Sequence, residues 1–544
     1  MHPVRAWLLA AACAAGCSSS ETLAPSPTMC QVQACPVAPL SYAAEVIPPA
    51  GSTAPTFEFA TFDPTSGLFT LAIPATVTLS GDVHIGSGTS THVVPSTVRA
   101  SRPSRIAGQP DVVYTAEIRV TDGTYTMQVT PTLDGEVYTL RVISDDPSEQ
   151  YPPQTFSIPV PADTRFALKL DDNLSLLQVT GAVTDAVQTP LRGLTVQALD
   201  LATRASVSTI ATTDIVGNYA IQLSSQEAKT VILQVAPPTS ELPTLEKRID
   251  LSKPGAGNTL TVNLAMPTGQ NAQKFSYPIV GNSSSGAMEP VPFATAAFTA
   301  DVSDPLAPDV TATVYVVTQS DAGGLATASL IPSRVYQLTV TPLGGSPYQS
   351  TTLPAFTVGP TGGTGGQIML DLRPKVTARV LAPNGKALPN VAVLTGVSSG
   401  DKQVNGRAEE IAQLPSDLTD SSGRISLALD AATYAYDFGL VPPPASGAAR
   451  SWIESVQVHA DVALGDLTLP VGTQAFGRVL DANGQTIAGA QVRLYSVAAS
   501  NAACVMGNLA CVSPPREIAE GTTDATGTAA FILPSSAPTL PAHN

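Results

Sequence analysis

Histidine and cysteine are the residue types best suited to metal binding and nucleophilic chemistry, and the 544-residue sequence contains only five His and six Cys. His84 and His92 form the one close histidine pair. They flank a Gly- and Ser-rich stretch, so a hairpin could place them across from each other. This spacing fits either two solvent-facing strand residues or a two-histidine metal site. No histidine has a glutamate at the ligand spacing of a zinc peptidase, and we predict no metal, no cofactor and no catalytic residue.

Loops rich in Gly, Ser and Asp do not match catalytic or ligand-binding patterns. Residues 281–286 (GNSSSG) lack the Gly-x-Ser-x-Gly order of a nucleophile elbow, and residues 362–366 (GGTGG) lack the Lys of a phosphate loop. Asp481 and Asn483 offer clustered oxygens, but Ca²⁺ needs about six to eight oxygen ligands. We therefore expect these loops to be turns, and we expect the chain not to be an enzyme.

The N-terminus predicts export. Arg5 precedes a short apolar run, residues 6–15, which has the order of a secretory signal and is too short to span a bilayer. The stretch is similar to a bacterial lipoprotein signal, which implies lipidation of Cys17. Ala14 stands where that family usually has Leu, so ordinary signal cleavage near Ala14 or Ala15 stays open. The resemblance implies a protein anchored by lipid in the bacterial cell envelope, in the outer membrane, with the side that it faces left open.

Cysteine arithmetic favours the lipid anchor over ordinary cleavage. If Cys13 is removed with the signal and Cys17 is acylated, an even set remains, whereas ordinary cleavage leaves an odd number. The remaining cysteines are two close pairs, Cys30 with Cys35 and Cys504 with Cys511. In an exported chain these are disulfide candidates, and free thiols are the alternative.

Composition and charge limit the class of protein. The chain has 48 Pro and 41 Gly, only 13% charged residues, and Thr, Val and Ala dominate the runs between turns. This composition is typical of many short strands. The net charge of -16 argues against nucleic-acid binding, because phosphate contacts need a basic face and none is visible.

Residues 179–235 carry a pattern around which the rest of the chain is organised. Apolar residues fall at every second position, which is the period of half-buried strands. Asp214 and Gly217 mark a turn, since Asp bonds nearby backbone groups and Gly tolerates positive φ. Gly193 marks another turn, and later copies place Asn390 and Gly489 there, as expected of a left-handed position.

These motifs resemble the carboxypeptidase regulatory-like domain, a transthyretin-like sandwich grouped with carbohydrate-binding-like folds. The matching features are Gly181-x-Val183, Leu191-x-Gly193-x-x-Val196 and Thr213-Asp214-x-x-Gly217-x-Tyr219-x-Ile221, with further copies starting near Val380, where Ala378 replaces the first Gly, and near Val479. The resemblance implies a seven-stranded fold and no active site. Such domains serve as accessory modules, spacers or binding platforms.

A longer repeat indicates an all-β tandem array of about five antiparallel β-sandwich modules. The first-strand Val recurs at 83, 183, 280, 380 and 479, and a turn Asp recurs at 122, 214, 321, 420 and 524. The copies holding Val83 and Val280 lack the Leu-x-Gly element, so they are either diverged modules or Ig-like sandwiches of another topology. The predicted organisation is a signal at 1–16, a tether at 17–40, a strand-rich lead-in at 41–74, diverged sandwiches at 75–173 and 275–373, and regulatory-like domains at 174–268, 374–470 and 471–544.

The two ends of the array each resemble part of a module. Residues 41–73 resemble a back half, and the last copy has only a front half before a Pro- and Ala-rich end. Either the register is shifted, or both ends carry open edges. Because an open edge strand invites pairing, we expect the last module to be incomplete, with an edge that is loosely ordered or completed by a partner.

Three functional classes fit the sequence. The first is a non-enzymatic envelope lipoprotein whose modules form a spacer and interaction scaffold, reaching on the order of 170 Å if the modules lie in line. The second is a carbohydrate- or peptidoglycan-binding surface lipoprotein, and the third an accessory subunit of an envelope enzyme or transport system. Trp452 is the candidate ligand platform, and packing of its indole on its own core is the alternative. Expected partners are the membrane, a carbohydrate or an envelope protein, and the oligomeric state is left open.

Overall fold

The chain is built almost entirely from β-strands. The computed structural model describes residues 41–540 except 53, 65–66, 86–91, 107–112, 146–150, 172–175, 225–229, 239–241, 253, 256, 267–271, 284, 305–306, 400–401, 408–416, 432–434, 498–514 and 535–538. In this part of the chain the only helical element is the 3₁₀ turn η1 (Pro444–Ser446). No helix among the described residues has the length and apolar character to cross a membrane.

The strands group into five modules, each of two sheets. Module 1 (77–170) has β4 (Val77–Ile85), β5 (His92–Val93), β6 (Ser96–Pro103), β7 (Val113–Val120), β8 (Thr124–Val129), β9 (Tyr138–Ser144), β10 (Gln154–Ile158), β11 (Thr164–Arg165) and β12 (Leu168–Leu170). Module 2 (177–266) has β13 (Leu177–Asp185), β14 (Thr195–Asp200), β15 (Ala211–Thr212), β16 (Asn218–Leu223), β17 (Thr230–Ala236), β18 (Thr244–Asp250), β19 (Thr259–Thr261) and β20 (Leu264–Met266). Module 3 (273–370) has β21 (Gln273–Asn282), β22 (Met288–Pro290), β23 (Thr295–Asp304), β24 (Ala307–Gln319), β25 (Leu325–Leu330), β26 (Val335–Thr341), β27 (Thr351–Thr357), β28 (Gly363–Thr364) and β29 (Ile368–Leu370).

The remaining strands form module 4, from one continuous stretch, and module 5, from both ends of the array. Module 4 (375–468) has β30 (Lys375–Leu381), β31 (Ala392–Ser399), β32 (Lys402–Arg407), β33 (Arg424–Ala428), β34 (Ala435–Val441), β35 (Ser451–Gln457) and β36 (Val462–Thr468). Module 5 (41–72 with 472–534) has β1 (Ser41–Ile47), β2 (Phe57–Phe62), β3 (Leu68–Ala72), β37 (Gly472–Leu480), β38 (Gln491–Val497), β39 (Arg516–Thr522) and β40 (Thr528–Pro534). The short β41 (Thr539–Leu540) pairs in parallel with β35 of module 4.

All five modules share one topology, which confirms the predicted array of antiparallel sandwiches. In module 2 the first strand, β13, lies between the antiparallel β16 and the parallel β19 and β20, and the second sheet has the order β15-β14-β17-β18. Modules 1 and 3 repeat this order with β8-β4-β11/β12 and β7-β6-β9-β10, and with β25-β21-β28/β29 and β24-β23-β26-β27. They are therefore diverged copies, and the alternative of another topology does not apply.

The repeated Asp forms the same turn in modules 2 to 5, as predicted, and a shorter turn in module 1. In module 2 the Asp214 Oδ1 accepts hydrogen bonds from the backbone N–H groups of Val216, at 2.9 Å, and Asn218, at 2.8 Å. Gly217, at φ 79°, then donates its N–H to the Asp214 carbonyl. Glycine is needed here because its φ is positive and because an added Cβ would meet the Val183 carbonyl at 2.5 Å. Asp321, Asp420 and Asp524 accept from the residues two and four positions on in the same way. In module 1 Asp122 directly precedes Gly123 and accepts from the N–H of Thr124.

The left-handed position before the second strand is also confirmed, with one addition. Gly193, Asn390 and Gly489 have φ of 76°, 58° and 75°. In module 3 the position belongs to Phe293, at φ 57°, although a bulky residue is strained there.

The first-strand marker of module 3 needs a correction of one residue. Ile279, and not Val280, donates to the turn glycine as Val183 does in module 2, because two adjacent apolar residues left the alternation ambiguous.

Alternating burial along the strands builds the cores. Strand β8 shows strict alternation of exposed and buried residues, as expected of a strand with one face on a core. Modules 1 and 4 each have a separate apolar cluster. Modules 2 and 3 share one cluster because β18 pairs with β24, which joins their second sheets into one of eight strands.

Module 5 is completed by the N-terminal residues of the same chain. Strand β1 pairs along its length with β38, from Ser41 opposite Val497 to Ile47 opposite Gln491, and β3 pairs in parallel with β37. The strands β1, β2 and β3 hold the places that β17, β18 and the last strand hold in module 2. This corrects the expected loose or partner-completed edge: the incomplete last copy and the lead-in are two parts of one sandwich, with one shared core.

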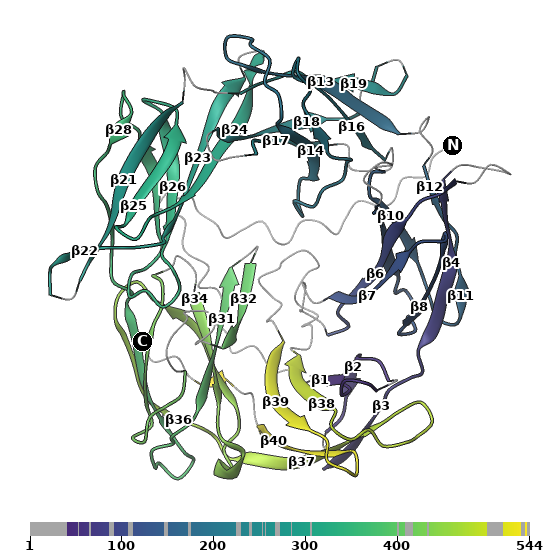
Figure 1. Cartoon of the computed structure of the whole chain (residues 1–544). Helices are drawn as coiled ribbons and strands as arrows, with labels where there is room; N and C mark the ends of the chain where they lie inside the picture. Colours follow the sequence, from purple (N-terminus) through teal and green to yellow (C-terminus); the bar gives the residue numbers. More distant parts are fainter. Residues whose placement is uncertain are drawn as a thin grey trace, which may run out of the picture.

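The five modules form a closed ring (Figure 1). The sheets that contain the first strand of each module lie on the outside, and we call them the outer sheets; the other sheets face inward and are called the inner sheets. Contacts at successive junctions are Arg141–Ser206, β18–β24, Arg373–Asp430, Trp452–Glu517 and Glu58–Arg102. The in-line arrangement that would reach on the order of 170 Å is thus corrected, because pairing of the two ends bends the array into a ring.

Candidate interaction sites

The predicted lipidation and disulfide residues lie outside the described residues. These are Cys17, Cys30, Cys35, Cys504 and Cys511. Their chemistry remains a prediction from the sequence.

Trp452, the predicted ligand platform, is buried at the junction between modules 4 and 5. Its side chain lies over Gly439, where an added Cβ would meet the indole at 2.9 Å. The indole Nε1 donates to the Glu517 carbonyl at 3.1 Å, and the Arg516 guanidinium lies 4.9 Å from the ring centroid. Only 7% of the residue is exposed. The indole is thus buried at a junction between two modules, a position that neither the platform nor packing on its own core describes.

Charged side chains surround Trp452 and join the two modules. The Arg516 Nη2 donates to Asp437 at 2.6 Å, and its Nε donates to Glu454 at 3.2 Å. Arg450 forms an ion pair with Glu517 at 2.7 Å. Since these groups are largely buried, removing one partner would leave an uncompensated charge. The junction therefore fixes the relative position of the two modules.

A second buried charged cluster lies where module 5 meets module 1. Glu58, on β2, is 1% exposed, and its two carboxylate oxygens accept hydrogen bonds from the Ser104 hydroxyl at 2.5 Å and the Arg105 N–H at 2.6 Å. Arg102 lies 3.7 Å away. The Arg105 guanidinium covers the Phe57 ring at 4.7 Å. The N-terminal segment is thus bound on one side to module 5 and on the other to module 1.

The junction between modules 2 and 3 has its own carboxylate. Burial would raise the pKa of Glu246, but hydrogen bonds from Arg204, Gln234 and Tyr315 outweigh burial and hold that pKa below its ordinary value. The Tyr315 hydroxyl is 2.9 Å from Glu246, and burial together with this carboxylate raises the pKa of Tyr315 to about 12. The cluster is a structural link between the inner sheets, since the carboxylate is held by groups from both modules.

The other candidate metal positions form turns and strand pairs. In the β4–β5 pair, His84 is opposite Val93 and Ile85 is opposite His92, so the two histidines are not directly across from each other. The Asp481 Oδ1 accepts from the N–H groups of Asn483 and Gln485, which is a turn geometry. Among the described residues no group of three or more His, Cys, Asp or Glu could hold a metal ion.

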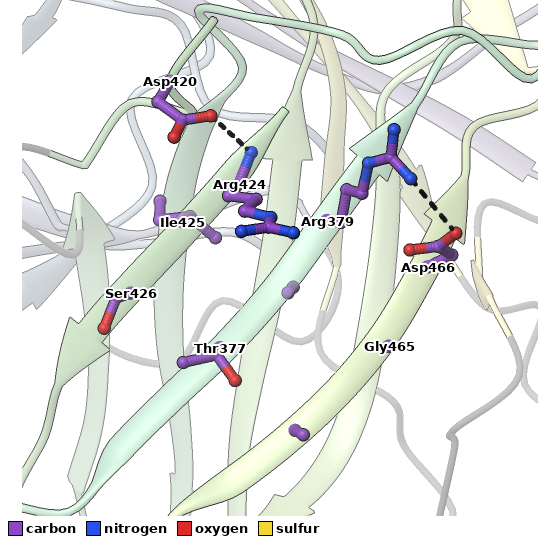
Figure 2. A pocket seen from close by; sticks show the side chains of 10 residues that line it. Thr377, Arg379, Asp420, Arg424, Ile425, Ser426, Gly465 and Asp466 are labelled. Atoms are coloured by element: carbon purple, nitrogen blue, oxygen red, sulfur yellow. Dashed lines mark hydrogen bonds and ion pairs between the residues drawn. The ribbon is translucent and has the colours of Figure 1, made fainter. Parts of the chain in front are cut away.

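The outer sheet of module 4 carries a hollow of about 550 Å³ that no sequence motif indicates (Figure 2). Its polar lining comes from three strands and one turn. The lining residues with charges or hydroxyls are Thr377, Arg379, Asp420, Arg424, Ser426 and Asp466. Gly465, at φ 72°, lies in a bulge of β36, where the register to β30 shifts. Such a bulge re-aims neighbouring side chains, and Asp466 turns toward Arg379, with which it forms an ion pair at 3.7 Å.

Two arginines of this hollow are directly opposite in the strand register, and the Arg379 guanidinium turns toward Asp466 (Figure 2). Arg379 on β30 is the antiparallel partner of Arg424 on β33. Figure 2 shows both guanidinium groups on the same side of the sheet. The Arg424 N–H donates to Asp420, whose pKa is held low first by the Ser422 hydroxyl and then by this N–H. Among the described residues no hydrogen bond or ion pair joins the Arg424 guanidinium to another group.

The sequence contains a signal for this pair in its repeat markers. Val380 aligns with Val479, so Arg379 aligns with Arg478. Arg424 and Thr528 each follow the turn Asp of their module by the same number of residues, so these two residues also align. In an antiparallel sheet these two markers define which residues are opposite, and the pairs Arg379–Arg424 and Arg478–Thr528 are observed. The hollow itself depends on the bulge at Gly465, which no motif predicts.

Comparison with known proteins gives similarity at the level of structure only. No protein-family model and no curated protein matches the sequence. Solved structures to which parts of the chain are similar include a Streptococcal ancillary pilin (12% identity, 55% of this chain and 99% of that chain, TM-score 0.19), the Bacillus anthracis TIE protein (12%, 71% and 73%, 0.18) and the shaft pilin SpaA from Lactobacillus rhamnosus GG (14%, 37% and 98%, 0.20). TM-scores this low mean that the whole chains do not superpose, so no property of these proteins is carried over.

Proposed function

We propose that the chain is a non-enzymatic scaffold of the bacterial cell envelope, in which a ring of sandwiches presents its outer sheets to partners. The observation that carries the proposal is the completion of module 5 by β1, β2 and β3. This pairing covers the strand edges that a linear array would leave open at its two ends. A closed ring of packed modules holds surfaces at fixed positions, which is what a scaffold requires.

The sequence supports the location and the domain type. The short apolar run before Cys17 favours export and lipid anchoring, and the tether that follows would hold the ring near a membrane. The Asp and Gly turns shared by the modules support assignment to the carboxypeptidase regulatory-like domains. A membrane through the lipid, and an envelope protein or carbohydrate on the ring, are the partners of this proposal.

Small-angle X-ray scattering of the exported part tests the ring. We expect a largest dimension well below the roughly 170 Å of five modules in line. A variant without residues 41–73 is the control, since it lacks the strands that close module 5 and should scatter as a longer particle. A wild-type curve as extended as that of the truncated variant would contradict the ring and, with it, the scaffold.

Metabolic labelling with a palmitate analogue tests the anchor. Wild-type protein should incorporate the label and fractionate with membranes, whereas Cys17→Ser should lose both properties. A matched variant, Cys13→Ser, should keep them, because Cys13 would be removed with the signal. Labelling that is independent of Cys17 would contradict the lipid anchor without affecting the ring.

A further inference from the structure

The outer sheet of module 4 places two like charges opposite each other at a position where none of the other four modules has two charged residues. Residues directly opposite in an antiparallel sheet have side chains about 5 Å apart, and like charges there are destabilising. Arg379 is opposite Arg424. The corresponding pairs elsewhere are Asp82–Thr124, Ala182–Asn218, Pro278–Leu325 and Arg478–Thr528. An anion bound between the two guanidinium groups would remove this repulsion.

The two arginines are only partly compensated by the protein. Asp466 is 3.7 Å from Arg379, with side-chain exposures of 57% and 44%, so this pair is weak and open to solvent. The Arg379 Nε donates to the Ser422 carbonyl at 3.3 Å, which orients the guanidinium without neutralising it. Arg424 is also exposed. Guanidinium groups match the planar geometry of a carboxylate and can bind it with two parallel hydrogen bonds.

We propose that this hollow binds an acidic saccharide, with its carboxylate between Arg379 and Arg424. The hollow of about 550 Å³ also presents the hydroxyls of Thr377 and Ser426 and the carboxylates of Asp420 and Asp466 (Figure 2). The aspartates accept hydrogen bonds from sugar hydroxyls, and the two hydroxyl groups can donate or accept. Inorganic phosphate carries more negative charge than a carboxylate and has no sugar hydroxyls to donate to the aspartates, so the mixed lining favours a singly charged carboxylate on a hydroxyl-rich molecule.

The site is independent of ring closure. The three strands that carry it, β30, β33 and β36, all belong to module 4, and none pairs with the N-terminal segment. A failure of the ring would therefore leave this inference standing, and a failure of saccharide binding would leave the ring standing.

Isothermal titration of the exported chain with a short glucuronic acid oligomer tests the site. The comparison ligands are the matching glucose oligomer and inorganic phosphate. We expect binding of the glucuronate oligomer and a loss of affinity of about tenfold or more in Arg424→Thr, since hydrogen bonds to charged groups are among the stronger ones. Arg478→Thr is the matched control, because Arg478 holds the position of Arg379 in module 5 but lies opposite a threonine.

Each result decides the proposal. Glucuronate binding that is lost in Arg424→Thr and kept in Arg478→Thr supports it. Equal binding of the glucose oligomer would overturn the role of the arginines, and equal or tighter binding of phosphate would overturn the saccharide. Absence of glucuronate binding, or binding that is unchanged in Arg424→Thr, would overturn the site. Circular dichroism of the variant confirms that it is folded.

Discussion

The Glu58 Oε2 and the Arg102 Nη1 lie 3.7 Å apart at the junction between module 5 and module 1, and their side chains are 0% and 1% exposed. Glu58 belongs to the N-terminal segment that completes module 5, and Arg102 lies near the end of a strand of module 1. Two opposite charges are therefore buried where the ring closes. A buried pair of this kind adds specificity to a contact, because the wrong arrangement leaves a charge without a partner.

Replacing Glu58 should loosen the closure. Glu58→Ala leaves Arg102 buried without its carboxylate and removes the acceptor for Ser104 and Arg105, so we expect a loss of about 3–5 kcal/mol in local stability. Hydrogen exchange of β1 and β38 measures it. Glu117→Ala breaks an exposed ion pair with Arg99 and should cost less than about 1 kcal/mol. Equal effects of the two substitutions would contradict the role of the buried pair.

The Asp turns should make the fold sensitive to acid. Hydrogen bonds, first of all from Thr526, hold the pKa of Asp524 below its ordinary value of 3.8, and Asp122 and Asp420 are lowered in the same way. A lowered pKa in the folded state means that the carboxylate stabilises the fold above the ordinary pKa, and that this contribution is lost as the pH falls through the folded pKa.

Asparagine provides the test of these turns, because its side-chain oxygen can accept the same bonds and does not titrate. The triple Asn variant at Asp122, Asp420 and Asp524 should lose less stability than wild type as the pH falls below about 4. Asp134→Asn is the control, since no hydrogen bond of its carboxylate is seen in the described part of the chain. Thermal unfolding as a function of pH measures the difference. The same loss of thermal stability at low pH in wild type and all variants would disprove the claim that these Asp turns cause the acid sensitivity.

The first-strand glycine of module 2 should not tolerate a side chain. A Cβ at Gly181 would meet the Val262 carbonyl oxygen at 1.9 Å, in the place where the Tyr219 hydroxyl donates to that oxygen at 2.7 Å. Gly181→Ala should therefore cost about 1–3 kcal/mol or more, measured by chemical unfolding. Gly366→Ala is the control, because nothing lies within 4 Å of the place that its Cβ would take and its φ is not positive. A cost no larger than that of the control would refute the close approach.

The fold could be predicted from the sequence because its turns need particular residues. Positive φ at Gly217 and a hydrogen-bonding Asp214 recur at one period, and alternation of apolar residues fixes which face is buried. Phe293 escaped prediction because a bulky residue is not expected at positive φ. Ring closure could not be predicted from the sequence, because strand pairing between residues about 450 apart, such as Tyr42 and Ser496, leaves no local sequence pattern.

The arginine pair should lower the stability of module 4. Arg424→Thr removes one of two like charges that are directly opposite. In the absence of ligand we therefore expect the free energy of unfolding of module 4 to rise by roughly 0.2–1 kcal/mol. Chemical unfolding at low ionic strength measures it, since salt screens exposed charges. Arg478→Thr, opposite Thr528, should give no such gain. A loss of stability in Arg424→Thr would mean that the arginine is structural.

The candidate site was less accessible to sequence analysis than the fold. The sequence predicts Trp452 as a platform from its polar surroundings, but pairing of β34 with β35 places Gly439 under the indole, and packing of module 5 against module 4 brings Arg516 over it. The arginine pair depends on cross-strand register, which a single sequence specifies only when both strands carry markers.

Ring closure is tested most directly by a disulfide trap between β1 and β38. Glu45 is the pairing partner of Arg493, so Glu45→Cys combined with Arg493→Cys places two thiols at directly opposite positions of adjacent strands. We expect oxidation of the dilute monomer to link residues 45 and 493 within one chain, as mapped by peptide mass spectrometry, while Glu45→Cys paired with Glu289→Cys in module 3 gives no link. Absence of the 45–493 link, or its formation only between two chains, would contradict a ring closed by its own N-terminal strands.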